Sequence, residues 1–267
     1  MNEFSLKNKT AIVTGACGLL GKQHCNALSE AGANVVAIDL NVIEAISVAE
    51  HLGTDSIGFG CDITERESVL HVKNKILDRF ESIDILVNNA AINDMVEDPK
   101  AAKEMSMFEN YPVELWNKSL SVNLTGTFLC SQVFGTVMAE NGGGSIINIA
   151  STYGMVAPDQ KLYRGINGEQ FYYKPPAYST TKGAVISFTK YLAAYWGNKG
   201  VRVNTLSPGG VENNQDSNFI SNYSGRTPLG RMAEATDYRG AIIFLASDAS
   251  KYMTGANLVV DGGWTCW

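Results

Sequence analysis

The chain has 267 residues, of which 45% are hydrophobic and 18% charged, a balance that supports a sizeable buried core and excludes a disordered protein. Its formal net charge of -6 argues against a nucleic-acid partner, because phosphate backbones are bound by clustered lysine and arginine. Residues 1–9 lack the apolar stretch of a signal peptide, and no apolar run is long enough to span a bilayer, so we expect a cytoplasmic protein with no membrane partner.

Short β-branched segments alternate with longer helical patterns, which is typical of βαβ units in a parallel sheet. Strands are expected at 10–13, 34–38, 57–61, 83–87, 145–149, 201–206 and 257–260. Helices are expected at 19–31, 42–52, 65–80, 113–139, 177–196 and 233–245. No linker or repeat divides the chain. The pattern therefore predicts one Rossmann-type doubly wound α/β domain over 1–267, with seven parallel strands and helices on both faces.

Three glycines, Gly15, Gly18 and Gly21, follow the first expected strand and precede a helix. Gly15 would turn the chain, Gly18 would let phosphates approach the backbone, and Gly21 would let the helix pack closely. A helix N-terminus also favours an anion. The turn predicts a site for a dinucleotide diphosphate; the alternative is an ordinary tight turn between strand and helix.

Asp39 stands 18 residues beyond Gly21, at the end of the second expected strand. A carboxylate there would accept hydrogen bonds from the adenosine ribose and would repel a 2′-phosphate. Neither Cys17 in the turn nor Leu40 and Asn41 after the strand offers a cation for that phosphate. We therefore expect NAD as cofactor rather than NADP; the alternative for Asp39 is a helix cap.

The cysteines and histidines suggest neither disulfides nor a metal site. The five cysteines are odd in number and share no C-x-x-C spacing. His24, His51 and His71 fall in expected helices without a suitably spaced carboxylate or second histidine. Reduced thiols and no bound metal are expected.

From Thr14 to Asp261-Gly262-Gly263 the order of motifs resembles that of the short-chain dehydrogenase/reductase family. Besides the glycine turn, the resemblance rests on Cys61-Asp62-Ile63, Asn88-Asn89-Ala90-Ala91, Ser121-Val122-Asn123, Ile149-Ala150-Ser151, Tyr178-x-x-x-Lys182 and Pro208-Gly209-Gly210-Val211. Three positions depart from the family pattern: the middle glycine at Gly18 is one place early, Ala91 replaces a Gly, and Asn213 stands where many relatives have Thr. The exact branch therefore stays open.

The resemblance implies an NAD-dependent oxidoreductase that acts on a CH–OH group, with Asn123, Ser151, Tyr178 and Lys182 as its catalytic set. The cofactor contacts implied by the turn and the resemblance are Gly15, Cys17, Gly18, Leu19, Leu20, Gly21, Asp39, Leu40, Cys61, Asp62, Ile63, Asn89, Ala90, Ala91, Tyr178, Lys182, Pro208, Gly209 and Val211.

Tyr178 would exchange the proton of the substrate alcohol, although a free tyrosine with a pKa near 10 is poorly ionised at neutral pH. Lys182, one helical turn later, is expected to lower that pKa by about two to three units. Ser151 would hydrogen-bond the substrate oxygen. The resemblance gives Asn123 a water that connects Lys182 to solvent. A second pair, Tyr195-x-x-x-Lys199, lies roughly 25 Å further along the same helix, at its wrong end.

Two segments, 93–112 and 157–176, do not fit the alternation of strands and helices, and both follow the carboxyl end of a strand. The second lengthens the chain between Ser151 and Tyr178 and is rich in aromatic and cationic residues, which predicts a substrate loop for a sugar or sugar derivative. A polar lid is expected at 211–230. Expected substrate contacts are Ser151, Tyr153, Tyr163, Arg164 and Tyr173. The alternative for 157–176 is a solvated flap or an oligomer contact.

These features also resemble, more loosely, the branch associated with bacterial flagellin and surface-glycan sugars. Two other functions stay open: a 3-oxoacyl thioester reductase, against which Asp39 argues, and an inactive NAD-binding sensor or scaffold, against which the intact catalytic set argues. The family resemblance implies a homo-oligomer, dimer or tetramer, that pairs through the helices at 113–139 and 177–196 and through C-terminal segments. The tail 264–267 is expected to be buried between subunits.

Overall fold

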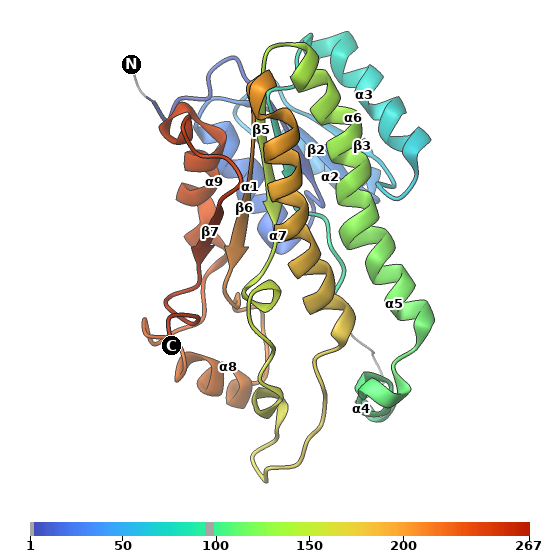
Figure 1. Cartoon of the computed structure of the whole chain (residues 1–267), viewed down its shortest axis with the longest axis vertical. Coiled ribbons are helices and arrows are strands. Elements are labelled where there is room, and N and C mark those ends of the chain that lie inside the picture. The colour runs from blue at the N-terminus through green and yellow to red at the C-terminus, as the bar shows by residue number, and fades with distance from the viewer. Residues whose placement is uncertain (1–2, 94–98) are drawn as a thin grey trace.

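The computed structural model describes residues 3–93 and 99–267. In that part of the chain the strands are β1 (Thr10–Thr14), β2 (Asn34–Asp39), β3 (Ile57–Gly60), β4 (Ile85–Asn88), β5 (Gly144–Ile149), β6 (Val201–Pro208) and β7 (Asn257–Val260). They form one parallel sheet in the order β3-β2-β1-β4-β5-β6-β7 (Figure 1). The expected doubly wound fold is confirmed. Because the order reverses between β1 and β4, a crevice opens at the carboxyl ends of these two strands.

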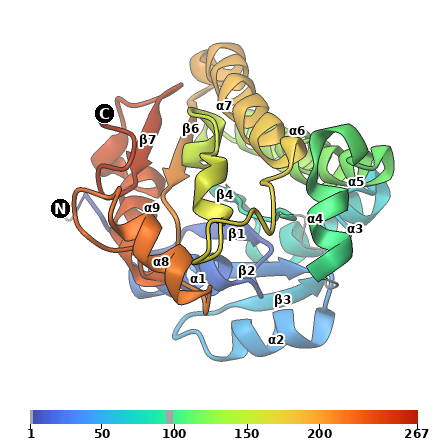
Figure 2. The same ribbon diagram turned by 90° about the horizontal axis from the view of Figure 1, so that it is seen from below.

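The described helices are α1 (Leu19–Glu30), α2 (Val42–Glu50), α3 (Arg66–Phe80), α4 (Pro99–Ser106), α5 (Val113–Leu120), α6 (Thr127–Glu140), α7 (Pro176–Trp196), α8 (Ser217–Ser224) and α9 (Arg239–Ala246). In Figure 2, α1, α2 and α9 cover one face of the sheet, and α3, α6 and α7 cover the other. Each face has its own apolar core: Ile12 of β1 belongs to the core under α3, α6 and α7, whereas its neighbour Val13 belongs to the core under α1 and α9. Burial on both faces explains why the strands are apolar throughout.

The helix expected at 113–139 is wrong as a single element, because a π-helical turn, Ser121–Gly126, separates α5 from α6. The side chain of Asn123 explains where the turn forms. Its Oδ1 accepts a hydrogen bond from the N–H of Ile92 at 2.8 Å, and its Nδ2 donates to the carbonyl of Ile92 at 3.0 Å. Gly126 lies so close to Ile63 that an added Cβ would be 2.6 Å from its Cδ1. The π-helical turn therefore forms where the helix packs against the segments that follow β3 and β4.

The helix expected at 233–245 starts later than predicted. A 3-10 turn, Ala235–Tyr238, precedes α9, and the carboxylates of Glu234 and Asp237 cap that turn reciprocally. Two short helices were not expected at all: α4 within the segment 93–112 and α8 within the segment 211–230. Their sequences carry too few apolar residues to show a clear helical period.

A row of buried polar side chains crosses the sheet from β4 to α7. Asn88 and Asn148 are paired across β4 and β5, and Nδ2 of Asn88 donates to Oδ1 of Asn148 at 2.8 Å. Nδ2 of Asn148 donates in turn to Oγ1 of Thr189 on α7 at 2.9 Å. In a low-dielectric interior such bonds fix one register between the layers, since an unpaired amide would be costly. The row holds α7 in place at the level of the strand ends.

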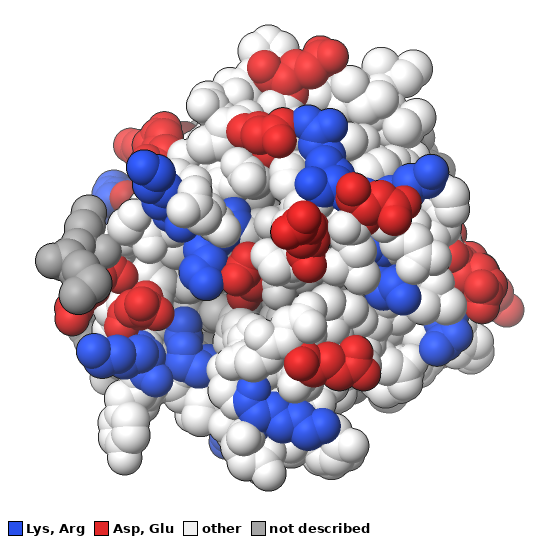
Figure 3. Space-filling model, turned by 90° about the horizontal axis from the view of Figure 1, so that it is seen from above, with Lys and Arg blue, Asp and Glu red and all other residues white. Residues whose placement is uncertain are grey.

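The segment 157–176 and α8 lie below the carboxyl edge of the sheet in Figure 1, and in Figure 2 they cross in front of it. At the opposite edge, basic and acidic side chains are intermingled over the visible face, which carries no patch of one sign among the residues described (Figure 3). No helix in the described ranges has the length and apolar character needed to cross a membrane.

His24, on the buried side of α1, generates a prediction about pH. Its side chain is fully buried, and neither ring nitrogen has a hydrogen-bond partner among the described residues, so burial lowers its pKa to about 4. The unfolded chain, with a pKa of about 6.5 at this residue, binds more protons between these values. Stability is therefore fully present above about pH 6.5 and is lost as the pH falls toward 4.

We expect His24 to lower the free energy of unfolding by about 2 kcal/mol between pH 7 and pH 5. Urea denaturation at both pH values measures this loss in the protein and in His24→Leu, which should remove most of it. His71→Leu, at an exposed position of α3, is the matched control and should leave the loss unchanged. An equal pH dependence in the protein and in His24→Leu would contradict the prediction.

Candidate active site

The glycine turn after β1 is shaped by close backbone contacts. Gly15 has a φ of +62°, and a Cβ on it would lie 2.7 Å from Cα of Ala90, while a Cβ on Gly21 would lie 2.1 Å from the carbonyl oxygen of Gly15. Nδ2 of Asn89 donates to the carbonyl of Gly15 at 3.0 Å. Only glycine fits at positions 15 and 21. Gly18 has more room, since its Cβ would meet only the Gly15 oxygen at 3.3 Å.

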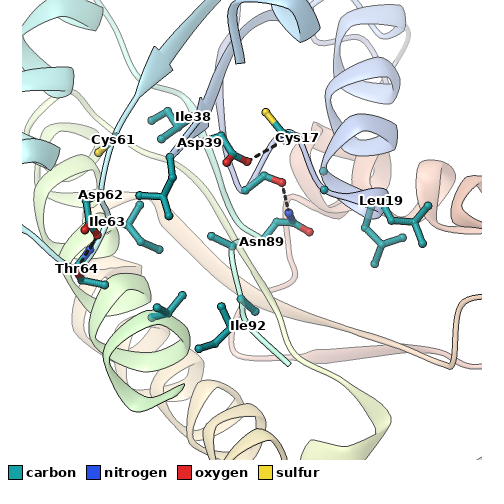
Figure 4. Close-up of a pocket in the computed structure, with 18 residues that line it drawn as sticks. Cys17, Leu19, Ile38, Asp39, Cys61, Asp62, Ile63, Thr64, Asn89 and Ile92 are labelled. Atoms are coloured by element: carbon teal, nitrogen blue, oxygen red, sulfur yellow. Dashed lines mark hydrogen bonds between the residues drawn. The ribbon is translucent and has the colours of Figure 1, made fainter. Parts of the chain in front are cut away.

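A cavity of about 430 Å³ opens beside this turn, where the strand order reverses (Figure 4). It is lined by Gly15, Cys17, Gly18, Leu19, Leu20, Gly21, Ile38, Asp39, Leu40, Cys61, Asp62, Ile63, Thr64, Asn89, Ala90, Ala91, Ile92 and Val122. Every expected cofactor contact from Gly15 to Ala91 lies in this lining. The sequence analysis missed Ile38, Thr64, Ile92 and Val122, which adjoin expected contacts and carry no pattern of their own. A bare backbone turn, a carboxylate and apolar walls fit a dinucleotide.

Asp39 points into this cavity and also holds the turn (Figure 4). Its Oδ2 accepts a hydrogen bond from the backbone N–H of Cys17 at 3.0 Å. The helix cap considered as an alternative for Asp39 is a different residue, Asn41. Its Oδ1 accepts a hydrogen bond from the N–H of Glu44 and caps α2. The carboxylate of Asp62 accepts from the N–H and the hydroxyl of Thr64 at 2.9 and 2.7 Å, which fixes the turn after β3.

A second cavity, of about 730 Å³, continues from the first, since Leu20, Asn89 and Ala91 line both. Its wall contains the remaining expected cofactor contacts, namely Tyr178, Lys182, Pro208, Gly209 and Val211. It also contains Ser151 and two expected substrate contacts, Tyr153 and Tyr163. The structure therefore brings the motif residues from β1, β5, β6 and α7 to one continuous cleft.

The Ser151 hydroxyl lies beside the phenol of Tyr178 in this second cavity, where it favours the ionised form of the phenol. Ser151 follows β5 and begins a 3-10 turn, in which its Oγ accepts the N–H of Tyr153 at 3.2 Å. Tyr178 lies in the first turn of α7, two residues after Pro176, which is the first residue of the helix. Two hydroxyls are thus fixed side by side at the carboxyl edge of the sheet.

The pKa of Tyr178 is raised in the structure described, whereas a lowered pKa was expected; the contribution of Lys182 to it stays a prediction. Burial raises the pKa of Tyr178, and the hydrogen bond with Ser151 opposes this only in part. Nζ of Lys182 lies 5.7 Å from the centre of the Tyr178 ring and donates to the carbonyl of Ile149 at 2.7 Å. Burial also lowers the pKa of Lys182 itself to about 8. Burial therefore disfavours the charged forms of both residues, the phenolate of Tyr178 and the ammonium of Lys182 that was expected to stabilise it.

Asn123 is buried, and both ends of its amide have partners. Besides its two bonds to Ile92, Nδ2 donates to Oγ1 of Thr181 on α7 at 3.2 Å. Its backbone carbonyl accepts the hydroxyl of Thr127 at 2.9 Å. The side chain thus ties the segment after β4 to the helix that carries Tyr178 and Lys182, while the water expected beside it stays a prediction.

Two expected substrate contacts, Arg164 and Tyr173, lie outside the wall of the second cavity. Arg164 is exposed, with its Nε donating to Gln170, and neither Arg164 nor Tyr173 lines the cavity. The expectation that the tail 264–267 is buried between subunits is wrong for Trp264, which is buried within its own chain against Tyr153 and Tyr223. Tyr195 lies near the other end of α7, beside a separate hollow.

Segments 157–176 and 211–230 pack together over the second cavity. The Tyr163 and Phe219 rings are 5.4 Å apart, Asn218 donates to the carbonyl of Arg164 at 2.9 Å, and Arg226 forms an ion pair with Asp159. The wall also contains residues that were expected neither as cofactor contacts nor as substrate contacts: Asn93, Ile149, Ala150, Thr152, Phe171, Tyr172, Lys174, Gly210, Asn214, Gln215, Asp216, Phe219, Tyr223 and Met232. The aromatic content of 157–176 was the available signal, but it did not say which rings turn inward.

Comparisons with known proteins place these features in context. A family model described as Enoyl-(Acyl carrier protein) reductase matches residues 15–265. The D-threitol dehydrogenase of Mycolicibacterium smegmatis is 37% identical, over 98% of this chain and 95% of its own. The structure of a gluconate 5-dehydrogenase from Burkholderia cenocepacia J2315 with NADP and tartrate is 32% identical, covers 100% of this chain and 98% of its own, and has a TM-score of 0.84. The structure of a short chain dehydrogenase from Leptospira borgpetersenii with bound NAD+ is 35% identical, covers 97% of this chain and 93% of its own, and has a TM-score of 0.84.

Proposed function

The chain belongs to the short-chain dehydrogenase/reductase family of dinucleotide-dependent oxidoreductases, and we propose that it transfers a hydride between NAD(H) and a secondary alcohol or ketone of a polyol or sugar derivative. The observation that carries the proposal is the continuous cleft, in which Ser151 and Tyr178 lie in the wall of the larger cavity and that cavity continues into the one beside the glycine turn. Alcohol oxidation requires an acid/base group in the same cleft as the cofactor.

In this mechanism Tyr178 accepts the proton of the substrate hydroxyl as the carbonyl forms, and it returns a proton in the reverse reaction. The hydroxyl of Ser151 donates a hydrogen bond to the substrate oxygen, where charge develops. Bound nicotinamide supplies the hydride acceptor or donor. The ammonium of Lys182 is held by the carbonyl of Ile149 in the same cavity wall as Tyr178, where it would favour the phenolate and bind the cofactor ribose. Asn123 orients α7 beneath these groups.

A polyhydroxylated substrate suits the wall of the second cavity. The rings of Tyr153, Tyr163 and Phe219 give it flat apolar surfaces, and Asn93, Asn214 and Gln215 add amide groups. Aromatic faces with a few polar groups suit the C–H faces and hydroxyls of a polyol or sugar acid. The relatives support this class, since they include dehydrogenases of D-threitol, of 2-dehydro-3-deoxy-D-gluconate and of galactitol. We propose that 157–176 and 211–230 form the cover of this substrate site.

The substrate class is tested by screening polyols, aldonic acids, sugar phosphates, nucleotide sugars and 3-oxoacyl thioesters for NAD(H) turnover. Turnover is expected with one or more of the sugar-derived compounds. Tyr178→Phe should lower kcat by at least about a thousandfold, because the acid/base group is lost, while NAD+ still binds. Tyr195→Phe, at the other tyrosine followed by a lysine at the same spacing, is the matched control and should keep normal turnover. Turnover of the acyl thioesters alone would contradict the proposed substrate.

NAD is proposed as the cofactor because the carboxylate of Asp39 stands in the cavity wall, where a 2′-phosphate would add a second negative charge. The relatives leave both cofactors open, since one solved structure holds NADP and another NAD+. The charge itself can be separated from the hydrogen bond to Cys17, because an asparagine side chain can accept the same N–H.

Asp39→Asn should therefore lower the preference for NAD over NADP, measured as the ratio of the two kcat/KM values, about tenfold through loss of charge repulsion. Asp39→Ala should change the ratio similarly and also weaken NAD+ binding, because the turn loses its bond to the carboxylate. Equal use of both cofactors by the unmodified protein would be incompatible with the proposal.

We also propose that the chain forms a homo-oligomer through α6 and α7. Tyr191 and Tyr195 stack at 5.9 Å and 10° on the outer face of α7, and both are about three-fifths exposed, at 62% and 60%. Phe128 of α6 and Phe188 of α7 continue this aromatic surface, with rings 6.2 Å apart. Large exposed aromatic patches are typical of subunit contacts.

Sedimentation analysis should find a dimer or tetramer, and Tyr195→Lys should shift it toward smaller species at micromolar concentration, because a charge would be buried at the contact. The control is Ile43→Lys, which places the same charge at an exposed apolar position of α2 and should not change the assembly. A monomeric unmodified protein would rule out the contact.

A further inference from the structure

Tyr178 has a second lysine beside its ring. Nζ of Lys174 lies 4.6 Å from the ring centre, closer than Nζ of Lys182 at 5.7 Å. Lys174 does not belong to α7, since it stands four residues before Tyr178 at the end of the segment 157–176. The tyrosine ring is therefore placed near two cations that come from different parts of the chain.

Lys174 is held at both its backbone and its side chain. Oε1 of Gln160 accepts the N–H of Lys174 at 2.8 Å, and Nε2 of Gln160 donates to its carbonyl at 3.3 Å. The ammonium group also contacts Oδ1 of Asn93, in the segment after β4. These contacts offset part of the rotamer entropy that a long side chain loses when it is ordered. The position above the ring is thus built by the surrounding loops.

The two lysines differ in their surroundings. Lys182 is buried, and burial disfavours its charged form. Lys174 is only half-buried and lines the open cavity. The lysine closer to the ring is therefore also the more exposed of the two.

We propose that Lys174 is a positioning residue that acts through Tyr178: its ammonium stabilises the phenolate and sets the pH above which the alcohol is oxidised. The inference rests on the proposed function of Tyr178 as the acid/base group. A cation over an aromatic face is attracted to the ring, and the attraction is stronger when the ring carries the charge of a phenolate. Lys174 thereby offsets part of the cost of ionising a buried phenol.

The other groups around Tyr178 do not duplicate this effect. Ser151 is a neutral hydrogen-bond partner, and burial raises the pKa of the neighbouring Tyr153, which keeps that phenol neutral. Asp216, at the start of α8, is the acidic side chain in the described wall of the cavity, and its Oδ1 accepts the N–H groups of Asn218 and Phe219. Lys174 and Lys182 are the cationic side chains in that wall.

The test compares pH profiles of kcat/KM for alcohol oxidation in Lys174→Met and Lys174→Arg. The methionine variant keeps the apolar stem and removes the charge. It should move the acidic limb of the profile upward by about half to one pH unit, which is a three- to tenfold loss of rate below that limb. The arginine variant should restore the limb, since it restores the cation. Lys161→Met, at an exposed lysine of the same segment, is the matched control and should not move it.

A second measurement needs no turnover, so it separates this inference from the proposed function. In protein labelled with ¹³C at the tyrosine ring carbon that bears oxygen, the Tyr178 resonance is assigned with Tyr178→Phe and titrated with and without NAD+. Lys174→Met should raise its ionisation midpoint by the same half to one unit. An unchanged midpoint, or a higher KM with no shift of the acidic limb, would overturn the inference and would leave Lys174 as a substrate contact. Absence of any alcohol turnover together with the shifted midpoint would count against the proposed function alone.

Discussion

Removal of Tyr178 from water raises the pKa of its phenol, and the proposed chemistry requires the same phenol to exchange a proton near neutral pH. Much of the surrounding structure can be understood from this conflict. The Ser151 hydroxyl lies beside the phenol, the ammonium groups of Lys174 and Lys182 lie near its ring, and the cleft suits a dinucleotide, whose oxidised nicotinamide ring is itself cationic. Burial disfavours the charged form of Lys182, whereas Lys174 is only half-buried.

The parallel sheet makes this arrangement possible because all of its strands end at one edge. The glycine turn follows β1, the Asn-Asn-Ala-Ala segment follows β4, Ser151 follows β5 and the Pro-Gly-Gly turn follows β6. The buried row from Asn88 through Asn148 to Thr189 fixes α7 against those strand ends, and Asn123 ties α7 to the segment after β4. A shift of α7 along the sheet would break several buried hydrogen bonds at once, which is costly where water cannot replace them.

The substrate side is built differently, from segments that lack regular strands. Leu162, Tyr223, Met232 and Trp264 form a third small core, separate from the two cores that cover the sheet. This core joins the segment 157–176, α8 and the C-terminal tail into one cover over the cavity. Such covers rest on few buried contacts compared with the sheet, so their structure can vary more readily than that of the sheet.

The sequence by itself determined the order of strands and helices, the glycine turn and the Tyr178–Lys182 spacing, because apolar periodicity, turn glycines and helical spacing are local properties of the chain. Most residues that line the dinucleotide cavity were also predicted from the sequence, because they adjoin the turn or a strand end. The tertiary structure alone decided the π-helical turn at Asn123, the burial of Trp264, the inward rings of the cover and the approach of Lys174 to Tyr178. It also reversed the expected direction of the Tyr178 pKa. Each of these depends on contacts between segments distant in the sequence, or on the exclusion of water, and neither is written in local spacing.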